Sequence, residues 1–125
     1  MFYLKYGECL KQKRIEKNIN AKTMAERLSI SPAYLSSLEN GSRRAPSFAL
    51  QEKIAEALSL TEDERYQFYD LAAENKQPPI LSKDLTEFIY QNPQIIKMLR
   101  YAMKCHLTEK EWKDVAGFVY KTYKY

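Results

Sequence analysis

The chain has 125 residues, of which 45% are hydrophobic and 29% are charged, and its formal net charge is +4. This length suits one domain, or one small domain with an appendage, and the composition is that of an ordinary soluble globular protein. No apolar run approaches a membrane-spanning length and the N-terminus lacks the order of a signal peptide, so we expect a cytoplasmic protein without a membrane segment.

A first helix is predicted over residues 4–18. Tyr6 and Leu10 recur on one face, with Ile15 as a further candidate, and this face is expected to pack on the core. The other positions carry four cations, which we interpret as a solvated face that can flank a phosphate backbone. These cations are Lys11, Lys13, Arg14 and Lys17.

Residues 20–41 predict two short helices joined by a tight turn. The first helix, over residues 21–28, follows the N-cap Asn20 and places Met24, Ala25 and Leu28 on one face. Ala25 is small, so a second helix can cross close to the first. This is the arrangement of a helix-turn-helix.

The second helix of the pair spans about residues 31–40, after the turn Ser29-Ile30. Ser31 is a favourable N-cap, Pro32 occupies the first helical position, and Gly41 tolerates the left-handed geometry that ends a helix. Its exposed flank carries small polar groups, which suits entry into the major groove of DNA.

The stretch MAERLSISPAYLSSLENG, residues 24–41, resembles the DNA-binding domain of phage-repressor-like (XRE-type) bacterial transcription regulators. The likeness covers about residues 5–74, and Leu-Glu-Asn-Gly followed by basic residues and Pro46 is its most specific part. Ser29 stands where the family usually has Gly, and Ala21 stands where it often has Gln. The alternative is a generic pair of packed helices. The resemblance implies an all-α chain, with a five-helix lambda-repressor-like DNA-binding domain followed by a short helical C-terminal region.

The resemblance also implies which residues touch double-stranded DNA. Base-contacting positions fall on residues 32, 33, 36 and 37, and phosphate-contacting positions fall on residues 20–22, at a helix N-terminus. Tyr34 either reaches the DNA or packs against the first helix. Arg43 and Arg44 either contact the DNA backbone or only complement a helix dipole. The complete predicted set is Asn20, Ala21, Lys22, Ser31, Pro32, Ala33, Tyr34, Ser36, Ser37, Asn40, Arg43 and Arg44.

Two further helices are expected to complete this domain. One starts at the N-cap Ser47, runs to about Leu58, and has an inner face of Phe48, Leu50, Ile54, Ala55 and Leu58. The other starts with a capping box at Thr61 and Glu64 and runs to about residue 74. Its candidate packing residues are Tyr66, Phe68, Tyr69 and Leu71.

Pro78 and Pro79 indicate a boundary, so we predict a DNA-binding domain over residues 1–75, a linker over 76–81 and a C-terminal region over 82–125. Three helices are predicted in this region: one capped by Ser82, one starting at Asn92-Pro93, and one after a capping box of Thr108 and Glu111. The region is rich in aromatic residues, which favour interfaces. They are Phe88, Tyr90, Tyr101, Trp112, Phe118, Tyr120, Tyr123 and Tyr125.

These aromatic residues leave four interpretations of residues 82–125 open. The region could form a homodimer, pack back on its own domain, bind another protein, or hold a small effector. Helix-turn-helix proteins usually bind two half-sites as a two-fold dimer, which favours the homodimer.

The positive charge lies in the half that carries the helix-turn-helix. Residues 1–60 hold ten Lys or Arg against six Asp or Glu, whereas residues 61–125 hold ten of each. This matches the electrostatic footprint of a phosphate-binding face. The single histidine, His106, follows Cys105 without further metal-ligand spacing, so we expect no metal, no cofactor and no enzymatic activity.

Together these observations predict a sequence-specific DNA-binding transcription regulator. The resemblance implies a dimeric repressor that acts by covering a promoter. The alternative is an antitoxin-type interaction protein whose residues 82–125 bind a partner while the N-terminal domain represses its own operon. A helix-turn-helix that makes only protein contacts is a further possibility.

Overall fold

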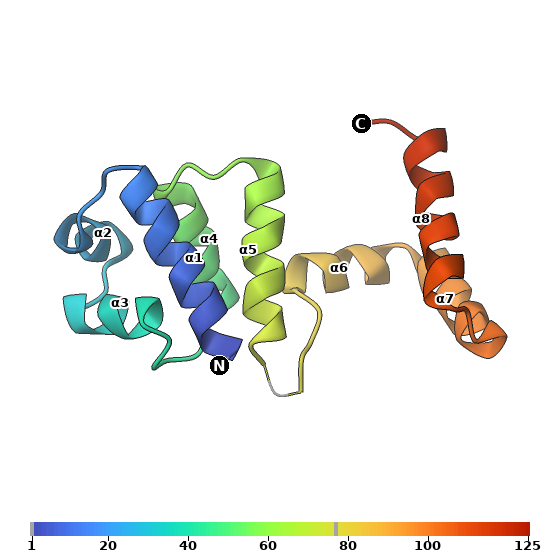
Figure 1. Ribbon diagram of the computed structural model, residues 1–125, viewed down its shortest axis with the longest axis horizontal. Helices are drawn as coiled ribbons and strands as arrows, with labels where there is room; N and C mark the ends of the chain where they lie inside the picture. The colour runs from blue at the N-terminus through green and yellow to red at the C-terminus, as the bar shows by residue number, and fades with distance from the viewer. Residues whose placement is uncertain (1, 77) are drawn as a thin grey trace. The chain divides into compact units, whose positions relative to one another are not determined.

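The computed structural model describes residues 2–76 and 78–125, and all regular structure within these ranges is helical. This confirms the predicted all-α fold. Gln77, in the predicted linker, lies outside the described residues. In chain order the helices are α1 (Phe2–Glu16), α2 (Ala21–Leu28), α3 (Pro32–Glu39), α4 (Phe48–Ala57), α5 (Glu62–Glu74), α6 (Lys83–Gln91), α7 (Pro93–Cys105) and α8 (Glu109–Thr122) (Figure 1).

The chain divides into two compact units, residues 1–85 (unit 1) and residues 86–125 (unit 2). Unit 1 contains α1 to α5 and the first residues of α6. Unit 2 contains the rest of α6 together with α7 and α8. Unit 1 therefore includes the segment 76–81, and the functional division of the chain at residue 75 stays a prediction.

The core of unit 1 is built around α1. Helix α1 packs against α3 and α5, α2 packs against α3 and α4, and α4 packs against α5 (Figure 1). The ring of Tyr6 meets the ring of Phe68 edge-on, with 5.1 Å between the centroids. Burying each such side chain contributes roughly 1.5–3 kcal/mol. The largest fully buried side chains are Tyr6, Leu10, Met24, Leu35, Leu38, Ile54 and Leu58.

The inner face of α1 differs from the prediction at one position. Ile15 is 56% exposed, whereas Arg14 is buried. Tyr6, Leu10 and Arg14 follow one another at intervals of four residues and so share one side of the helix. Ile15 lies one position further round, on the solvent side. The helix also ends at Glu16, two residues earlier than expected.

Helices α4 and α5 begin with the predicted caps. The Ser47 hydroxyl accepts a hydrogen bond from the Leu50 amide at 3.3 Å. The capping box of α5 is confirmed, because Thr61 N donates to the Glu64 carboxylate at 2.9 Å and Glu64 N donates to the Thr61 hydroxyl at 3.2 Å. Tyr66 was predicted to pack inside, but it is 48% exposed and its hydroxyl donates to Glu62.

Unit 2 exposes most of its apolar side chains. Ala102 is its one buried hydrophobic residue within residues 86–125, all of which the structure describes. The capping box of α8 at Thr108 and Glu111 is confirmed. Asn92 does precede Pro93, but its side chain donates to the Phe88 carbonyl at 2.7 Å and makes no cap hydrogen bond. The large hydrophobic residues left exposed are Phe88, Tyr90, Met98, Leu99, Tyr101, Met103, Trp112, Val115, Phe118, Val119, Tyr120, Tyr123 and Tyr125.

Within residues 2–76 and 78–125, no helix has the length and apolar character that crossing a membrane requires.

Candidate nucleic-acid interface

The turn between α2 and α3 is made by Ser29 in a left-handed conformation, with φ 55° and ψ 42°. The next residue continues the turn, because Ile30 N donates to the Ala25 carbonyl at 3.0 Å. A residue with a Cβ atom pays roughly 1–2 kcal/mol for this geometry, which glycine adopts freely. Ser29 therefore does take up the turn in place of the usual glycine, at some expense in stability.

The N-terminus of α2 presents backbone donors to solvent. The Asn20 side-chain oxygen accepts from Thr23 N at 2.8 Å. The cap uses this oxygen and leaves the amide N–H groups of Ala21 and Lys22 at the open end of the helix. All three predicted phosphate-contacting residues, 20–22, are exposed. Their arrangement suits an anion, because the positive end of the helix dipole lies there.

Helix α3 presents small side chains on its outer surface. Its first turn is fixed by the Ser31 hydroxyl, which accepts from Tyr34 N at 3.0 Å, and by Pro32 at the first helical position. Leu35 and Leu38 are fully buried and hold the opposite side of the helix on the core. The predicted base-contacting residues Pro32, Ala33 and Ser36 are exposed, and Ser37 is half-buried.

The Ser37 hydroxyl is already engaged within α3, because it donates to the Ala33 carbonyl at 3.0 Å. While this hydrogen bond is kept, Ser37 offers DNA only an acceptor. Pro32 and Ala33 offer apolar surface. Among the predicted base-contacting residues, Ser36 is thus the side chain best placed to donate, and α3 carries no side chain that can bind a base edge with two hydrogen bonds.

Tyr34 combines the two roles considered for it. Its ring is half-buried against the core. The guanidinium of Arg43 lies over the same ring, 6.0 Å from its centroid, which is within the range of a cation–π interaction. Tyr34 therefore connects the core to a predicted DNA-contacting arginine.

The loop that carries Arg43 and Arg44 is fastened to the end of α3. The Asn40 side-chain oxygen accepts from Ser42 N at 2.9 Å, and Arg43 N donates to the Ser37 carbonyl at 3.2 Å. Gly41 supplies the left-handed conformation, with φ 80°. Since Ala45 and Pro46 are buried while both arginines are exposed, the loop is anchored at its two ends and displays its cations.

An internal ion pair that the sequence analysis missed holds α3 in place. Arg14 Nε and Nη2 donate to the two carboxylate oxygens of Glu39 at 2.7 and 2.9 Å, and Nη1 donates to the Ile19 carbonyl at 2.9 Å. The prediction that Arg14 belongs to the solvated face of α1 is therefore wrong. Its four-residue spacing from Leu10 was the available signal.

A second ion pair removes another cation from that face. Lys13 donates to Glu64 at 2.7 Å, which joins α1 to the first turn of α5. Lys11 and Lys17 remain exposed. A count of lysines and arginines therefore overestimates the positive charge that unit 1 can present to a phosphate backbone.

A family model covers the helix-turn-helix described above. Residues 10–65 match the family model described as helix-turn-helix, which confirms the predicted phage-repressor-like motif. No curated protein matches the chain. Among solved structures, a chain titled "SinR protein/SinI protein complex" is similar, with 23% identity, coverage of 90% of this chain and 91% of that chain, and a TM-score of 0.44.

Proposed function

We propose that unit 1 is a helix-turn-helix DNA-binding domain of the phage-repressor-like type, and that through it the chain acts as a sequence-specific repressor that binds operator DNA as a dimer. The bound dimer would cover a promoter and exclude polymerase. The observations that carry this proposal are the exposed N-terminus of α2, the exposed small side chains of α3 and the two exposed arginines of the loop that follows it. Together they provide backbone N–H donors, a helix with small side chains and two cationic groups.

The chemistry of this surface favours binding through phosphates and DNA shape. Backbone N–H groups at Ala21 and Lys22 and the side chains of Arg43 and Arg44 suit phosphate oxygens. The side chains of α3 are too short for bidentate contacts with bases. Discrimination among sequences would then depend strongly on how easily the DNA bends or narrows.

The exposed apolar side chains of unit 2 support the dimer. A unit of 40 residues, with Ala102 as its one buried hydrophobic residue, is too small to be stable on its own core. Association of two copies would cover side chains such as Phe118 and Tyr120. A two-fold dimer would also place two copies of α3 about one DNA turn apart, at roughly 34–36 Å.

The proposal is tested by fluorescence anisotropy of the full chain with its own upstream DNA and with scrambled DNA, over a salt series. Preferential binding to the upstream DNA, weakening steeply with salt, is expected. Changing Arg43 and Arg44 together to Ala should lower the slope of log K against log salt by up to about two units, since each phosphate contact contributes about 0.9.

The matched control changes Lys110 and Lys121 to Ala. Both are exposed lysines of α8 outside the proposed interface, so the slope should stay as in the native chain. Equal and weak binding to both DNAs, at every salt concentration, would contradict the sequence-specific repressor.

The same exposed apolar surface supports the second candidate function, an antitoxin-type protein that binds a partner through residues 82–125. The two candidates differ in what the purified chain does alone. A dimer in light scattering favours self-association. A monomer that binds tightly to the product of a neighbouring gene favours the partner-binding protein.

A further inference from the structure

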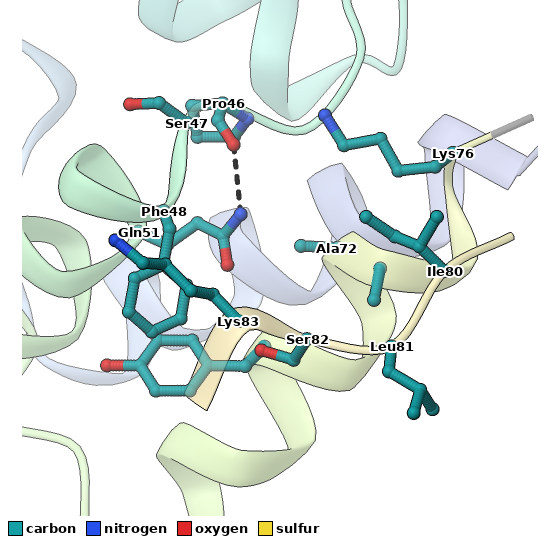
Figure 2. Close-up of a pocket in the computed structure, with 12 residues that line it drawn as sticks. Pro46, Ser47, Phe48, Gln51, Ala72, Lys76, Ile80, Leu81, Ser82 and Lys83 are labelled. Carbon is teal, nitrogen blue, oxygen red and sulfur yellow. Dashed lines mark hydrogen bonds between the residues drawn. The ribbon is translucent and has the colours of Figure 1, made fainter. Parts of the chain in front are cut away.

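Unit 1 contains a cavity of about 170 Å³ next to Pro46 and Ser47, which follow the arginine loop in the chain (Figure 2). One wall comes from Pro46, Phe48 and Gln51, at the start of α4. The facing wall comes from the last turns of α5, including Ala72, and from the segment at Ile80. An apolar cavity of 150 Å³ is large enough to hold benzene, so this space suits one aromatic ring.

A buried acceptor faces this space. Gln51 is only 8% exposed. Its amide nitrogen donates to the Pro46 carbonyl at 2.9 Å, and its amide oxygen is buried without a hydrogen-bond partner. Figure 2 shows the amide nitrogen toward Pro46 and the oxygen on the other side, between Phe48 and Ala72 in this view. Since buried acceptors are nearly always paired, a donor from a ligand would complete this site.

Two lysines line the same cavity. Lys83 Nζ lies 5.9 Å from the centroid of the Phe48 ring. Lys76 is half-buried, and its side chain extends toward the loop at Pro46 (Figure 2). The neighbouring residues Ile80 and Leu81 are each 56% exposed, so this wall borders solvent. The cavity thus has an apolar interior, a buried hydrogen-bond acceptor in the Gln51 amide oxygen, and two lysines in its lining.

We propose that this cavity binds a single-ring aromatic carboxylate that carries a hydroxyl or amino group. The ring packs against Phe48, Tyr69 and Ala72. The hydroxyl or amino group donates to the Gln51 amide oxygen. The carboxylate lies toward Lys76, near the wall of Ile80 and Leu81 that borders solvent.

Such a ligand would act on DNA binding, which is the part of this inference that rests on the proposed function. Gln51 holds the carbonyl of Pro46, and Pro46 is two residues from Arg44. A group bound to the Gln51 amide would therefore alter the position of Pro46, where the arginine loop is anchored. Ligand binding is expected to change the affinity of the chain for its operator.

The site is tested by titrating the ¹⁵N-labelled full chain with 4-hydroxybenzoate, benzoate and 4-hydroxybenzyl alcohol. We expect saturable shifts of the amide signals of residues 47–51, 72–76 and 80–83 with 4-hydroxybenzoate. Benzoate lacks the donor and the alcohol lacks the charge, so each should bind about tenfold more weakly.

Two variants separate the contributions of the acceptor and the lysines. Gln51→Leu replaces the amide with an apolar side chain of similar size and so removes the acceptor. The variant should then bind 4-hydroxybenzoate and benzoate equally. Changing Lys76 and Lys83 to Gln should abolish the preference for the carboxylate over the alcohol. The control changes Lys97 and Lys104, two exposed lysines of α7, to Gln. It should leave the affinities for all three compounds unchanged.

Absent or non-saturable shifts, or equal binding of all three compounds by the native chain, would overturn the site. The regulatory step is overturned if 4-hydroxybenzoate binds but leaves the Kd for operator DNA unchanged. Failure to bind DNA in the absence of any ligand would instead contradict the proposed function, and the NMR titration would still decide the site.

Discussion

The guanidinium of Arg14 donates two hydrogen bonds, of 2.7 and 2.9 Å, to the two carboxylate oxygens of Glu39, and both side chains are about nine-tenths buried. Glu39 is the last residue of α3, and Arg14 lies in the last turn of α1. The pair therefore fixes the C-terminal end of the predicted recognition helix to the centre of unit 1.

Breaking this pair from one side should be costly. Glu39→Gln or Arg14→Met leaves a buried charge without its partner, so we expect the free energy of unfolding to fall by about 3–5 kcal/mol. The double variant Arg14→Met with Glu39→Met should recover part of this loss, since it removes both charges. Urea unfolding followed by circular dichroism measures both effects. Additive losses in the double variant would show that the two side chains do not act as a pair.

Gly7 allows α1 and α3 to approach closely. A Cβ atom at this position would collide with the Leu38 carbonyl oxygen and would lie 2.7 Å from the Glu39 carbonyl oxygen. Gly7→Ala should therefore displace α3, lower stability by about 1–3 kcal/mol and weaken DNA binding.

Gly117 provides the matched control, because a Cβ atom there has no other heavy atom within 4 Å. Gly117→Ala lies within α8 and should raise helix stability by about 0.5–1 kcal/mol. Thermal unfolding of both variants distinguishes a steric effect from a general effect of glycine replacement. Equal stability changes in the two variants would contradict the close approach at Gly7.

Stability should depend on pH through Glu64. The hydrogen bond from Lys13, followed by the hydrogen bond from the Thr61 backbone, lowers the pKa of Glu64 from its ordinary value of 4.5 to about 2. Because the folded protein binds this proton more weakly than the unfolded chain does, the stabilisation is present above pH 4.5 and is lost as the pH falls toward 2.

The variant Glu64→Gln should flatten the stability curve in this acidic range, as measured by urea unfolding at several pH values. Glu111 is the internal comparison. Its pKa is also lowered, by the backbone N–H and the hydroxyl of Thr108, without a lysine partner. NMR titration of the carboxyl groups should give Glu64 the lower pKa, and the reverse order would contradict the contribution of Lys13.

Tyr34 should contribute to DNA binding by positioning Arg43. Tyr34→Ala removes the ring beneath the guanidinium, and we expect operator binding about two- to fivefold weaker, as for an exposed cation–π contact of about 0.5–1 kcal/mol. Tyr34→Phe keeps the ring and should bind almost as the native chain does. Anisotropy in an Arg43→Ala background provides the control, where Tyr34→Ala should have no further effect. A loss with Tyr34→Phe would instead indicate a direct contact of the hydroxyl.

The exposed apolar surface of unit 2 should hold the dimer together. Phe118 is 63% exposed on α8, so Phe118→Glu should leave the helix intact and produce a monomer in light scattering. Lys121→Glu, on the same helix, changes charge without removing an apolar contact and should stay dimeric. A Phe118→Glu chain that remains dimeric with unchanged stability would exclude this surface as the dimer contact.

The sequence was most informative where structure depends on neighbouring residues. The caps Asn20, Ser31 and Thr61 are all confirmed, because a capping side chain bonds to an amide two or three positions away. The buried position of Arg14 could not be predicted in the same way. It depends on Glu39, twenty-five residues further along.

The cavity also could not be predicted from sequence patterns, because its lining residues come from separate segments of the chain. Gln51 lies among apolar positions of α4 as an ordinary polar residue, and only the fold brings it opposite Ala72 and Ile80. The prediction that the aromatic residues lie at an interface likewise followed from composition alone. Their exposure became visible only in the packing of unit 2, which buries Ala102 and leaves the aromatic side chains exposed.

In the proposed interface, the small side chains of α3 would determine how many positions in a genome compete for this protein. Each bidentate base contact would contribute about 1–3 kcal/mol of discrimination, and Pro32, Ala33, Ser36 and Ser37 supply none of these. A half-site recognised in this way carries little sequence information, so near-matches are common along a chromosome. In the proposed dimer, selectivity would then come from DNA shape and from the spacing of the paired half-sites. A modest rise in copy number would extend occupancy from the best operator to a graded series of weaker ones.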